Sequence, residues 1–132
     1  MPALRIMCRM LGLHLTADLR GCAAAQPLMT EPAALRAFCL HAVATAGLLA
    51  VGELFHVFPH PGGVTGVVLL AESHLAVHTW PELGAVTLDV YVCNLHDDNS
   101  ACADALLAAL AAGFGPGHVQ HQRVRRGGLL PA

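Results

Sequence analysis

The sequence is organised around one stretch, residues 71–82, which reads Ala71-Glu72-Ser73-His74-Leu75-Ala76-Val77-His78-Thr79-Trp80-Pro81-Glu82. Polar and apolar residues alternate in it, which predicts a strand with one buried face. The even-numbered residues from His74 to His78 would share one face, and the odd-numbered residues from Ser73 to Val77 the other. One interpretation is an amphipathic strand whose polar face meets water. The other is that Glu72-Ser73 marks a reactive peptide bond, and the alternation alone does not decide between them.

Composition limits the classes of protein that this chain can belong to. A length of 132 residues indicates one domain, and 55% hydrophobic residues with 12% charged residues predict a sizeable core with apolar surface left for a partner. The net charge of −2 argues against a nucleic-acid binder, since only residues 123–126 are locally basic. These features favour a small globular protein that pairs with another protein surface.

Lysine is absent from the chain, and all seven basic residues are arginine. A pyridoxal-phosphate enzyme holds its cofactor on a lysine, so we expect no such cofactor here. Five cysteines, an odd number, do not indicate a disulfide framework. Residues 1–10 lack the apolar run of a secretory leader, and no segment approaches the roughly 20 apolar residues of a membrane span. We therefore expect a cytoplasmic protein without membrane contact.

The order of predicted elements indicates a two-layer α/β sandwich, with an antiparallel or mixed sheet and two helices on one face. Strands are expected at residues 11–19, 49–58, 64–71, 73–79, 85–93 and 118–125. One helix is expected after an N-cap at Thr30, and the other runs from residues 97–99 to 112, while residues 20–29 form a loop. The apolar run 64–71 predicts a strand buried on both faces, and residues 73–79 would continue in its direction or follow a kink. The uncovered face of the sheet would pack on a second copy.

Residues 72–82 resemble the signature of the prokaryotic S-adenosylmethionine decarboxylases, small pyruvoyl enzymes that cut their own chain between the Glu and the Ser. The resemblance extends to four other segments and covers residues from about 11 to about 124; these segments are 12–18, 55–58, 63–68 and 88–93. We therefore treat residues 1–10 as an N-terminal extension and residues 11–132 as a single decarboxylase-like domain.

The resemblance implies self-cleavage into chains 1–72 and 73–132. The Ser73 hydroxyl would attack the Glu72 carbonyl to give an ester, and loss of the Ser73 α-proton would release the Glu72 carboxylate. The remaining dehydroalanine would hydrolyse to a pyruvoyl group and ammonia. That ketone can form a Schiff base with a substrate amine and store the electrons released when carbon dioxide leaves. A pyruvoyl group thus supplies the electron sink that a chain without lysine cannot obtain from pyridoxal phosphate.

The resemblance also implies roles for individual residues. His78 matches the family's histidine for the elimination step, and Thr65 stands where the family carries a serine that supports processing. Cys93 matches the catalytic cysteine that returns a proton to the carbon that lost carbon dioxide. Phe58 matches an aromatic residue that stacks on adenine, and Glu82 matches a carboxylate that holds the ribose hydroxyls. The implied substrate is S-adenosylmethionine, the product is the aminopropyl donor for spermidine synthesis, and the implied assembly is a homodimer of cleaved chain pairs with active sites at the interface.

Three alternatives remain open at this point. Relatives of the family use pyruvoyl chemistry on arginine or ornithine, and an unprocessed paralogue would serve as a binding or regulatory subunit. A zinc site from His74-x3-His78 and Cys93-x2-His96 is disfavoured, because zinc sites usually show more closely spaced ligand pairs. Our expectation is therefore that no metal takes part.

Overall fold

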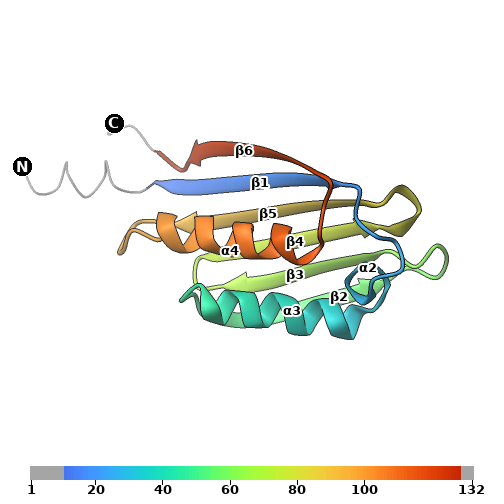
Figure 1. The fold of residues 1–132 in the computed structure, drawn as a ribbon. Helices are drawn as coiled ribbons and strands as arrows, with labels where there is room; N and C mark the ends of the chain where they lie inside the picture. Colours follow the sequence, from blue (N-terminus) through green and yellow to red (C-terminus); the bar gives the residue numbers. More distant parts are fainter. Residues whose placement is uncertain (1–10, 129–132) are drawn as a thin grey trace, which may run out of the picture.

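The computed structural model describes residues 11–128, so the predicted extension at residues 1–10 lies outside the described residues. The elements occur in the order β1 (Gly12–Arg20), α2 (Pro27–Thr30), α3 (Pro32–Thr45), β2 (Ala50–Val57), β3 (Val64–Leu70), β4 (Ser73–Trp80), η1 (Pro81–Leu83), β5 (Ala85–Cys93), α4 (Ser100–Gly113) and β6 (His118–Arg126). Figure 1 shows the sheet as one layer with the helices lying along one of its faces. The predicted α/β sandwich is confirmed.

The sheet has six strands in the order β2-β3-β4-β5-β1-β6, and every neighbouring pair is antiparallel. Strand β4 lies near the centre, with β3 and β5 on its two sides. The first strand, β1, is inserted between β5 and β6, so the two ends of the described chain pair with each other along one edge. This arrangement gives the signature strand β4 a neighbour on each side that carries predicted site residues.

The core lies between the sheet and the helices. Leu75, Val77 and Thr79 of β4 are buried, as the alternation predicted, while His74, Ala76 and His78 lie on the opposite, partly open face. The long helices contribute the other side of the core with residues Leu35, Cys39, Ala42 and Val43 of α3 and Ala103, Leu106, Leu107, Leu110 and Ala111 of α4. Burial of these apolar side chains is the main stabilising contribution to the fold.

Two expectations about the centre of the sheet are wrong. Strand β4 does not continue the direction of β3, because Leu70 pairs with Ser73 and the chain reverses in the two-residue turn Ala71-Glu72. Strand β3 is also not buried on both faces, since the side chain of Leu69 is 51% exposed while Val68 is fully buried. A run of apolar residues does not distinguish these cases when one face of the sheet lacks helices.

Helix positions differ from the prediction at their starts. The expected loop at residues 20–29 contains the one-turn helix α2, and α3 has Glu31 rather than Thr30 at its N-cap, with no side-chain cap hydrogen bond. Pro27 and Pro32 each begin a helix, which suits the fixed backbone angle of proline and its missing N–H. Among the described residues, no helix is long and apolar enough to cross a membrane.

Candidate active site

The Glu72-Ser73 peptide bond lies in the tight turn between β3 and β4. Glu72 has a φ of 57°, in the left-handed region that side chains other than glycine rarely adopt. A two-residue hairpin requires such an angle, and a non-glycine residue there stores about 1–3 kcal/mol of strain. The residue before the predicted cleavage point is therefore held in an unfavourable conformation.

Ser73 and Cys93 are neighbours across β4 and β5. The Cys93 backbone N–H donates a hydrogen bond to the Ser73 Oγ at 3.2 Å, and both residues are partly buried. Cys93 is the last residue of β5, and Asn99 donates a hydrogen bond from its side-chain amide to the Cys93 carbonyl at 2.9 Å. The structure thus brings together the two residues predicted to act at the reacting carbon.

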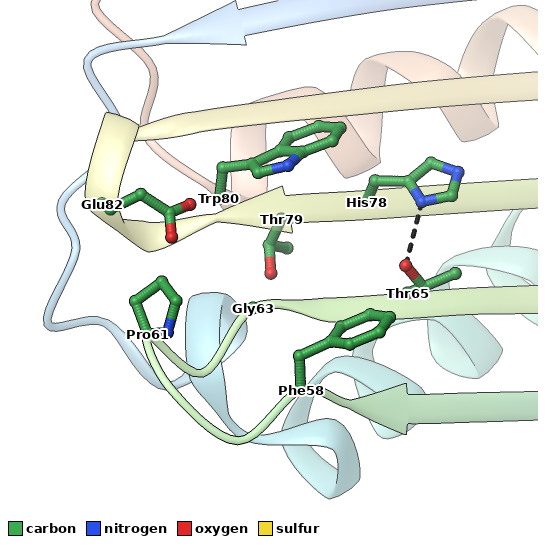
Figure 2. Close-up of a pocket in the computed structure, with 8 residues that line it drawn as sticks. All are labelled: Phe58, Pro61, Gly63, Thr65, His78, Thr79, Trp80 and Glu82. Atoms are coloured by element: carbon green, nitrogen blue, oxygen red, sulfur yellow. Dashed lines mark hydrogen bonds between the residues drawn. The ribbon is translucent and has the colours of Figure 1, made fainter.

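A second group of predicted residues lines a pocket of about 300 Å³ at the other end of β4. The pocket lies on the face of the sheet opposite α3 and α4, and Figure 2 shows the residues that surround it: Phe58, Pro61, Gly63, Thr65, His78, Thr79, Trp80 and Glu82. Four predicted site residues belong to this set. Thr65 and His78 are those predicted to support processing, and Phe58 and Glu82 are those predicted to contact the substrate. The sequence prediction did not assign Trp80 to this set.

His78 is the centre of a chain of contacts within the pocket. Its Nδ1 lies 3.0 Å from the Thr65 Oγ1 in a hydrogen bond across β4 and β3, where the two residues are directly paired. On its other side the His78 ring stacks on the Trp80 ring, with centroids 5.9 Å apart and an interplanar angle of 30°. These two contacts fix the orientation of the imidazole.

The two groups are far apart within one chain. Ser73 and His78 are separated by five residues of continuous strand, which corresponds to about 17 Å at the usual rise of a β-strand. An imidazole cannot remove a proton from the Ser73 α-carbon across that distance. The structure of a single chain therefore does not unite all the residues predicted for one reaction.

Thr79 is a residue that the sequence analysis missed. It is the only buried polar residue recorded in the described part of the chain, at 4% exposure. Its Oγ1 accepts a hydrogen bond from the Val64 N–H at 2.8 Å and donates one to the Met29 carbonyl at 2.8 Å. These bonds join β4 to the start of β3 and to α2, so they hold the floor of the pocket. The signal in the sequence is a hydroxyl residue in the buried register of an alternating strand.

A second missed feature is a polar cluster on the open face across β1, β4 and β5. The His14 Nε2 lies 2.7 Å and the His74 Nε2 3.5 Å from the Asp89 Oδ2, and the His74 ring stacks on Tyr91. Their ligand atoms lie within 4.8 Å of one another, which is close enough for the three to hold a metal ion together. However, the Arg126 guanidinium donates to the His14 Nδ1 at 3.2 Å.

That contact favours one tautomer of the His14 ring. Because a guanidinium can only donate, the His14 Nδ1 is an acceptor and a neutral ring carries its proton on Nε2, directed at Asp89. In this structure the three side chains thus contact one another through hydrogen bonds. The earlier zinc alternative also fails geometrically, since His74 and His78 lie about 13 Å apart along β4.

The fold and the site together define a class of small α/β proteins with enzyme-like features. These features are a six-stranded antiparallel sheet with helices on one face, a Glu-Ser bond in a strained hairpin and an aromatic pocket on the open face. The family model described as S-adenosylmethionine decarboxylase matches residues 13–127. The chain belongs to the S-adenosylmethionine decarboxylase family, and the resemblance identified from residues 72–82 is confirmed.

Individual relatives support the same family. The chain is 46% identical over 87 residues to the S-adenosylmethionine decarboxylase proenzyme of Aquifex aeolicus, covering 66% of this chain and 62% of that protein. It is 40% identical over 116 residues to the proenzyme of the same name from Symbiobacterium thermophilum, covering 88% of this chain and 83% of that protein. The crystal structure of the adenosylmethionine decarboxylase from Aquifex aeolicus superposes with a TM-score of 0.80 at 34% identity, covering 90% of this chain and 92% of that chain.

Proposed function

We propose that the chain is a cytoplasmic, self-cleaving, pyruvoyl-dependent S-adenosylmethionine decarboxylase that supplies the aminopropyl donor for spermidine synthesis. The observation that carries the proposal is the Glu72-Ser73 bond, placed in a strained hairpin with Ser73 beside Cys93. Membership of the family makes this arrangement interpretable as a cleavage site. Two chains, 1–72 and 73–132, are the expected mature form.

Cleavage would begin at the hairpin. The Ser73 Oγ attacks the Glu72 carbonyl carbon, the Glu72–Ser73 C–N bond breaks, and an ester with a free Ser73 amine remains. Removal of the Ser73 α-proton then breaks the Cβ–Oγ bond and releases the Glu72 carboxylate. Water adds to the imine tautomer of the resulting dehydroalanine and ammonia leaves, which generates the pyruvoyl group. Relief of the left-handed conformation of Glu72 favours the cut state by about 1–3 kcal/mol.

The surrounding residues suit the decarboxylation step. The pyruvoyl group supplies an electron sink for the electrons released with carbon dioxide. The Cys93 backbone N–H contacts the Ser73 Oγ, so the Cys93 residue lies close to the position at which the substrate would lose its carboxylate, and its thiol is the candidate proton donor there. This placement supports the role of Cys93 as the proton donor.

The pocket supports an adenosyl substrate over a basic amino acid. Phe58 presents an exposed ring for stacking on adenine, and Glu82 presents a carboxylate that can accept hydrogen bonds from both ribose hydroxyls. The Phe58 N–H donates to the Gly63 carbonyl at 2.8 Å, which closes the loop that carries the ring. Thr65 at the pocket's inner end keeps His78 oriented.

A second copy of the chain would complete the site. Because Ser73 and His78 of one chain lie about 17 Å apart along β4, we infer that His78 and Thr65 of the partner reach Ser73 and Cys93. The open face of the sheet carries the apolar side chains of Leu54 and Leu69, which are 71% and 51% exposed. An uncovered sheet face with exposed leucines is typical of an interface. Each site of the homodimer would then borrow residues from both chains.

Intact mass of the purified protein tests the cleavage. Wild-type protein should give two chains of 72 and 60 residues (132 − 72), whereas Ser73→Ala should remain a single chain of 132 residues. A single full-length wild-type species after prolonged incubation would contradict the proposal and favour an unprocessed paralogue.

Release of carbon dioxide tests the substrate. The processed protein should act on S-adenosylmethionine, and the matched assays use arginine and ornithine. Faster release from either basic amino acid would overturn the choice of substrate while leaving the pyruvoyl chemistry in place.

Sedimentation tests the assembly. The wild-type protein should sediment as a dimer at micromolar concentration, and Leu54→Asp on the open face should shift it towards monomer. Leu83→Asp is the matched control, because Leu83 is equally exposed at 71% but belongs to η1 at the end of β4. A wild-type monomer at this concentration would contradict the shared site.

A further inference from the structure

We propose that His14, His74 and Asp89 form a binding site for a divalent transition-metal ion, with Zn²⁺ as the ion that suits it best. The three side chains lie together on the open face of the sheet, and none of them has a part in the proposed reaction. The inference therefore goes beyond the proposed function, because it concerns a ligand that the decarboxylation chemistry does not need. It also differs from the zinc alternative considered from the sequence, which combined His74 with a different set of ligands.

The register of the sheet brings the two histidines together. His14 of β1 and His74 of β4 are both paired with Tyr91 of β5, one from each side. Asp89 lies two residues before Tyr91, so it is on the same face of β5. The Nε2 atoms of His14 and His74 lie 2.7 Å and 3.5 Å from the same Asp89 oxygen, Oδ2. Three neighbouring strands thus direct three donor groups to one point.

The distances between the ligand atoms suit a small ion. The two Nε2 atoms and the carboxylate oxygen all lie within 4.8 Å of one another. In a tetrahedral zinc site with bonds of about 2.0–2.1 Å to nitrogen and oxygen, neighbouring ligand atoms are about 3.3–3.4 Å apart. The observed separations bracket this value, so small side-chain rotations are enough to bring the ligands into place. Two imidazoles and one carboxylate favour Zn²⁺ over Mg²⁺ or Ca²⁺, which prefer oxygen ligands alone.

Tyr91 holds both imidazoles in place. Its ring stacks on the His74 ring at a centroid distance of 5.8 Å and meets the His14 ring edge-on at 5.9 Å. Gly12 allows this position, because an added Cβ there would overlap the Tyr91 hydroxyl. In the single chain the side chains of His14, Asp89 and His74 are 19%, 28% and 37% exposed, so an ion can reach them from solvent. Ligands that are ordered in advance lose little conformational entropy on binding.

Arg126 is the group that the ion must displace. Its guanidinium donates to the His14 Nδ1, which leaves the proton of the neutral ring on Nε2. A metal bound at Nε2 requires the other tautomer, in which the proton has moved to Nδ1 and this atom no longer accepts from Arg126. The contact is exposed, and the Arg126 guanidinium also lies 5.6 Å from the centroid of the Tyr91 ring. Loss of one exposed charged contact costs little, so Arg126 lowers the affinity for the ion without preventing binding.

Binding would connect the ion to the strands of the proposed active site. His74 directly follows Ser73, and β5, which carries Asp89, ends at Cys93. The unfolded chain does not bring the three ligands together, so an ion held by β1, β4 and β5 would stabilise the folded chain.

The experiment titrates Zn²⁺ into the purified protein after metals have been removed with a chelator. Calorimetry should show one Zn²⁺ bound per protomer, with a dissociation constant in the micromolar range or below, and Zn²⁺ should raise the midpoint of thermal unfolding. Asp89→Asn and His74→Gln should each weaken binding by more than about 100-fold, because loss of a ligand costs more than the roughly 10–100-fold lost with a hydrogen-bond partner of a ligand. His41→Gln is the matched control and should bind as wild type does, since His41 is an exposed histidine of α3, on the other face of the sheet.

Arg126→Ala tests the displacement through a gain of affinity, so it does not depend on a variant that loses binding. It should bind Zn²⁺ about three- to fivefold more tightly than wild type, the size expected for one exposed charged contact. Equal or weaker binding by this variant would contradict coordination through the His14 Nε2.

The remaining outcomes decide the site as a whole. Absence of stoichiometric Zn²⁺ binding would overturn it. Equal affinity of wild type, Asp89→Asn and His74→Gln would also overturn it, because the bound ion would then lie on other side chains. None of these measurements involves turnover, so their failure leaves the proposed decarboxylase standing, and an inactive protein that binds Zn²⁺ as described would leave the metal site standing.

Discussion

The two faces of β4 differ in what they do, although they alternate residue by residue along one strand. Leu75, Val77 and Thr79 on the helix-covered face are buried, and they fix the position of the strand. His78 and Trp80 on the open face contact each other and line the pocket. The helix-covered face has a complete environment within one chain, whereas the open face does not.

This difference between the two faces indicates which face needs a second copy of the chain. The core lies between the sheet and the helices of the same chain. Ser73 at the start of β4 and His78 on its open face are separated by most of the strand, so we propose that a single chain does not complete the reaction that these residues share. We therefore expect open-face variants to lose chemistry while keeping stability, and buried-face variants to do the reverse.

The largest expected effect is on the open face, at His78. His78→Ala should stall cleavage at or before elimination and lower decarboxylation by roughly 10²–10⁴-fold, as removal of a general base does. The midpoint of thermal unfolding should stay close to that of wild type, because His78 is only partly buried. Intact mass, carbon dioxide release and calorimetry measure the three quantities.

Mixing variants sharpens this test of the interface. Co-expressed Ser73→Ala and His78→Ala chains form hybrid dimers in which one Ser73 meets one intact His78 of the partner. Since half of randomly assembled dimers are hybrids and each has one complete site, about a quarter of wild-type processing should return. Separately purified variants that are never allowed to exchange subunits provide the control. Zero recovery in stable hybrid dimers would place both residues in the same site of one chain.

A smaller effect is expected from substitution of Cys93, and this substitution distinguishes self-cleavage of the chain from decarboxylation of the substrate. Cys93→Ala should still give chains 1–72 and 73–132, although more slowly if the side chain helps to position Ser73. Decarboxylation should fall by roughly 10²-fold or more, because the carbon that lost carbon dioxide lacks its acid. Intact mass and turnover are measured on the same sample. Normal cutting with a wild-type rate of decarboxylation would leave Cys93 as a structural residue only.

The sequence predicts much of this arrangement and fails in definite places. Alternation predicted both faces of β4, because the period of two directly reports the side that a residue faces. It did not predict the reversal at Ala71-Glu72, since neither residue is a usual hairpin residue and the φ of Glu72 is unfavourable on its own. A turn that violates local preference can be seen only in the structure, and here it coincides with the proposed cleavage point.

For the candidate site too, some features were predicted from the sequence and others were not. The resemblance identified Ser73, His78 and Cys93, and the structure shows which of them are neighbours. Contacts between distant segments carry no local signal, so the His14–Asp89 pair, whose members are 75 positions apart in the sequence, was not predicted. Trp80 was overlooked for a different reason, because a lone aromatic residue at a strand end is as typical of a core as of a pocket.

On the buried face, Thr79→Val should affect stability more than any open-face substitution does, even though Thr79 also lines the pocket. The exchange keeps the shape of the side chain but leaves the Val64 N–H and the Met29 carbonyl without their hydrogen-bond partner. Each unsatisfied buried group costs about 1–3 kcal/mol, so the free energy of unfolding should fall by at least that amount. Thr87→Val, on the half-buried open face of β5, is the matched control and should change little. Equal effects of the two variants in denaturant unfolding would remove the distinction between the faces.

The smallest expected effect concerns a thiol that should not react at all. Cys39 of α3 faces the sheet and is fully buried, and this burial raises the pKa of its thiol to about 12. At pH 8 the thiolate fraction is then about 10⁻⁴, and only the thiolate is alkylated. Iodoacetamide should therefore leave Cys39 unmodified in the native protein while it modifies the half-buried Cys102, with peptide mass mapping as the measurement. After unfolding in guanidinium both should react alike, which shows that burial and not local sequence protects Cys39. Rapid alkylation of native Cys39 would mean that α3 separates readily from the sheet. The helix-covered face would then be exposed to solvent for part of the time, as the open face is.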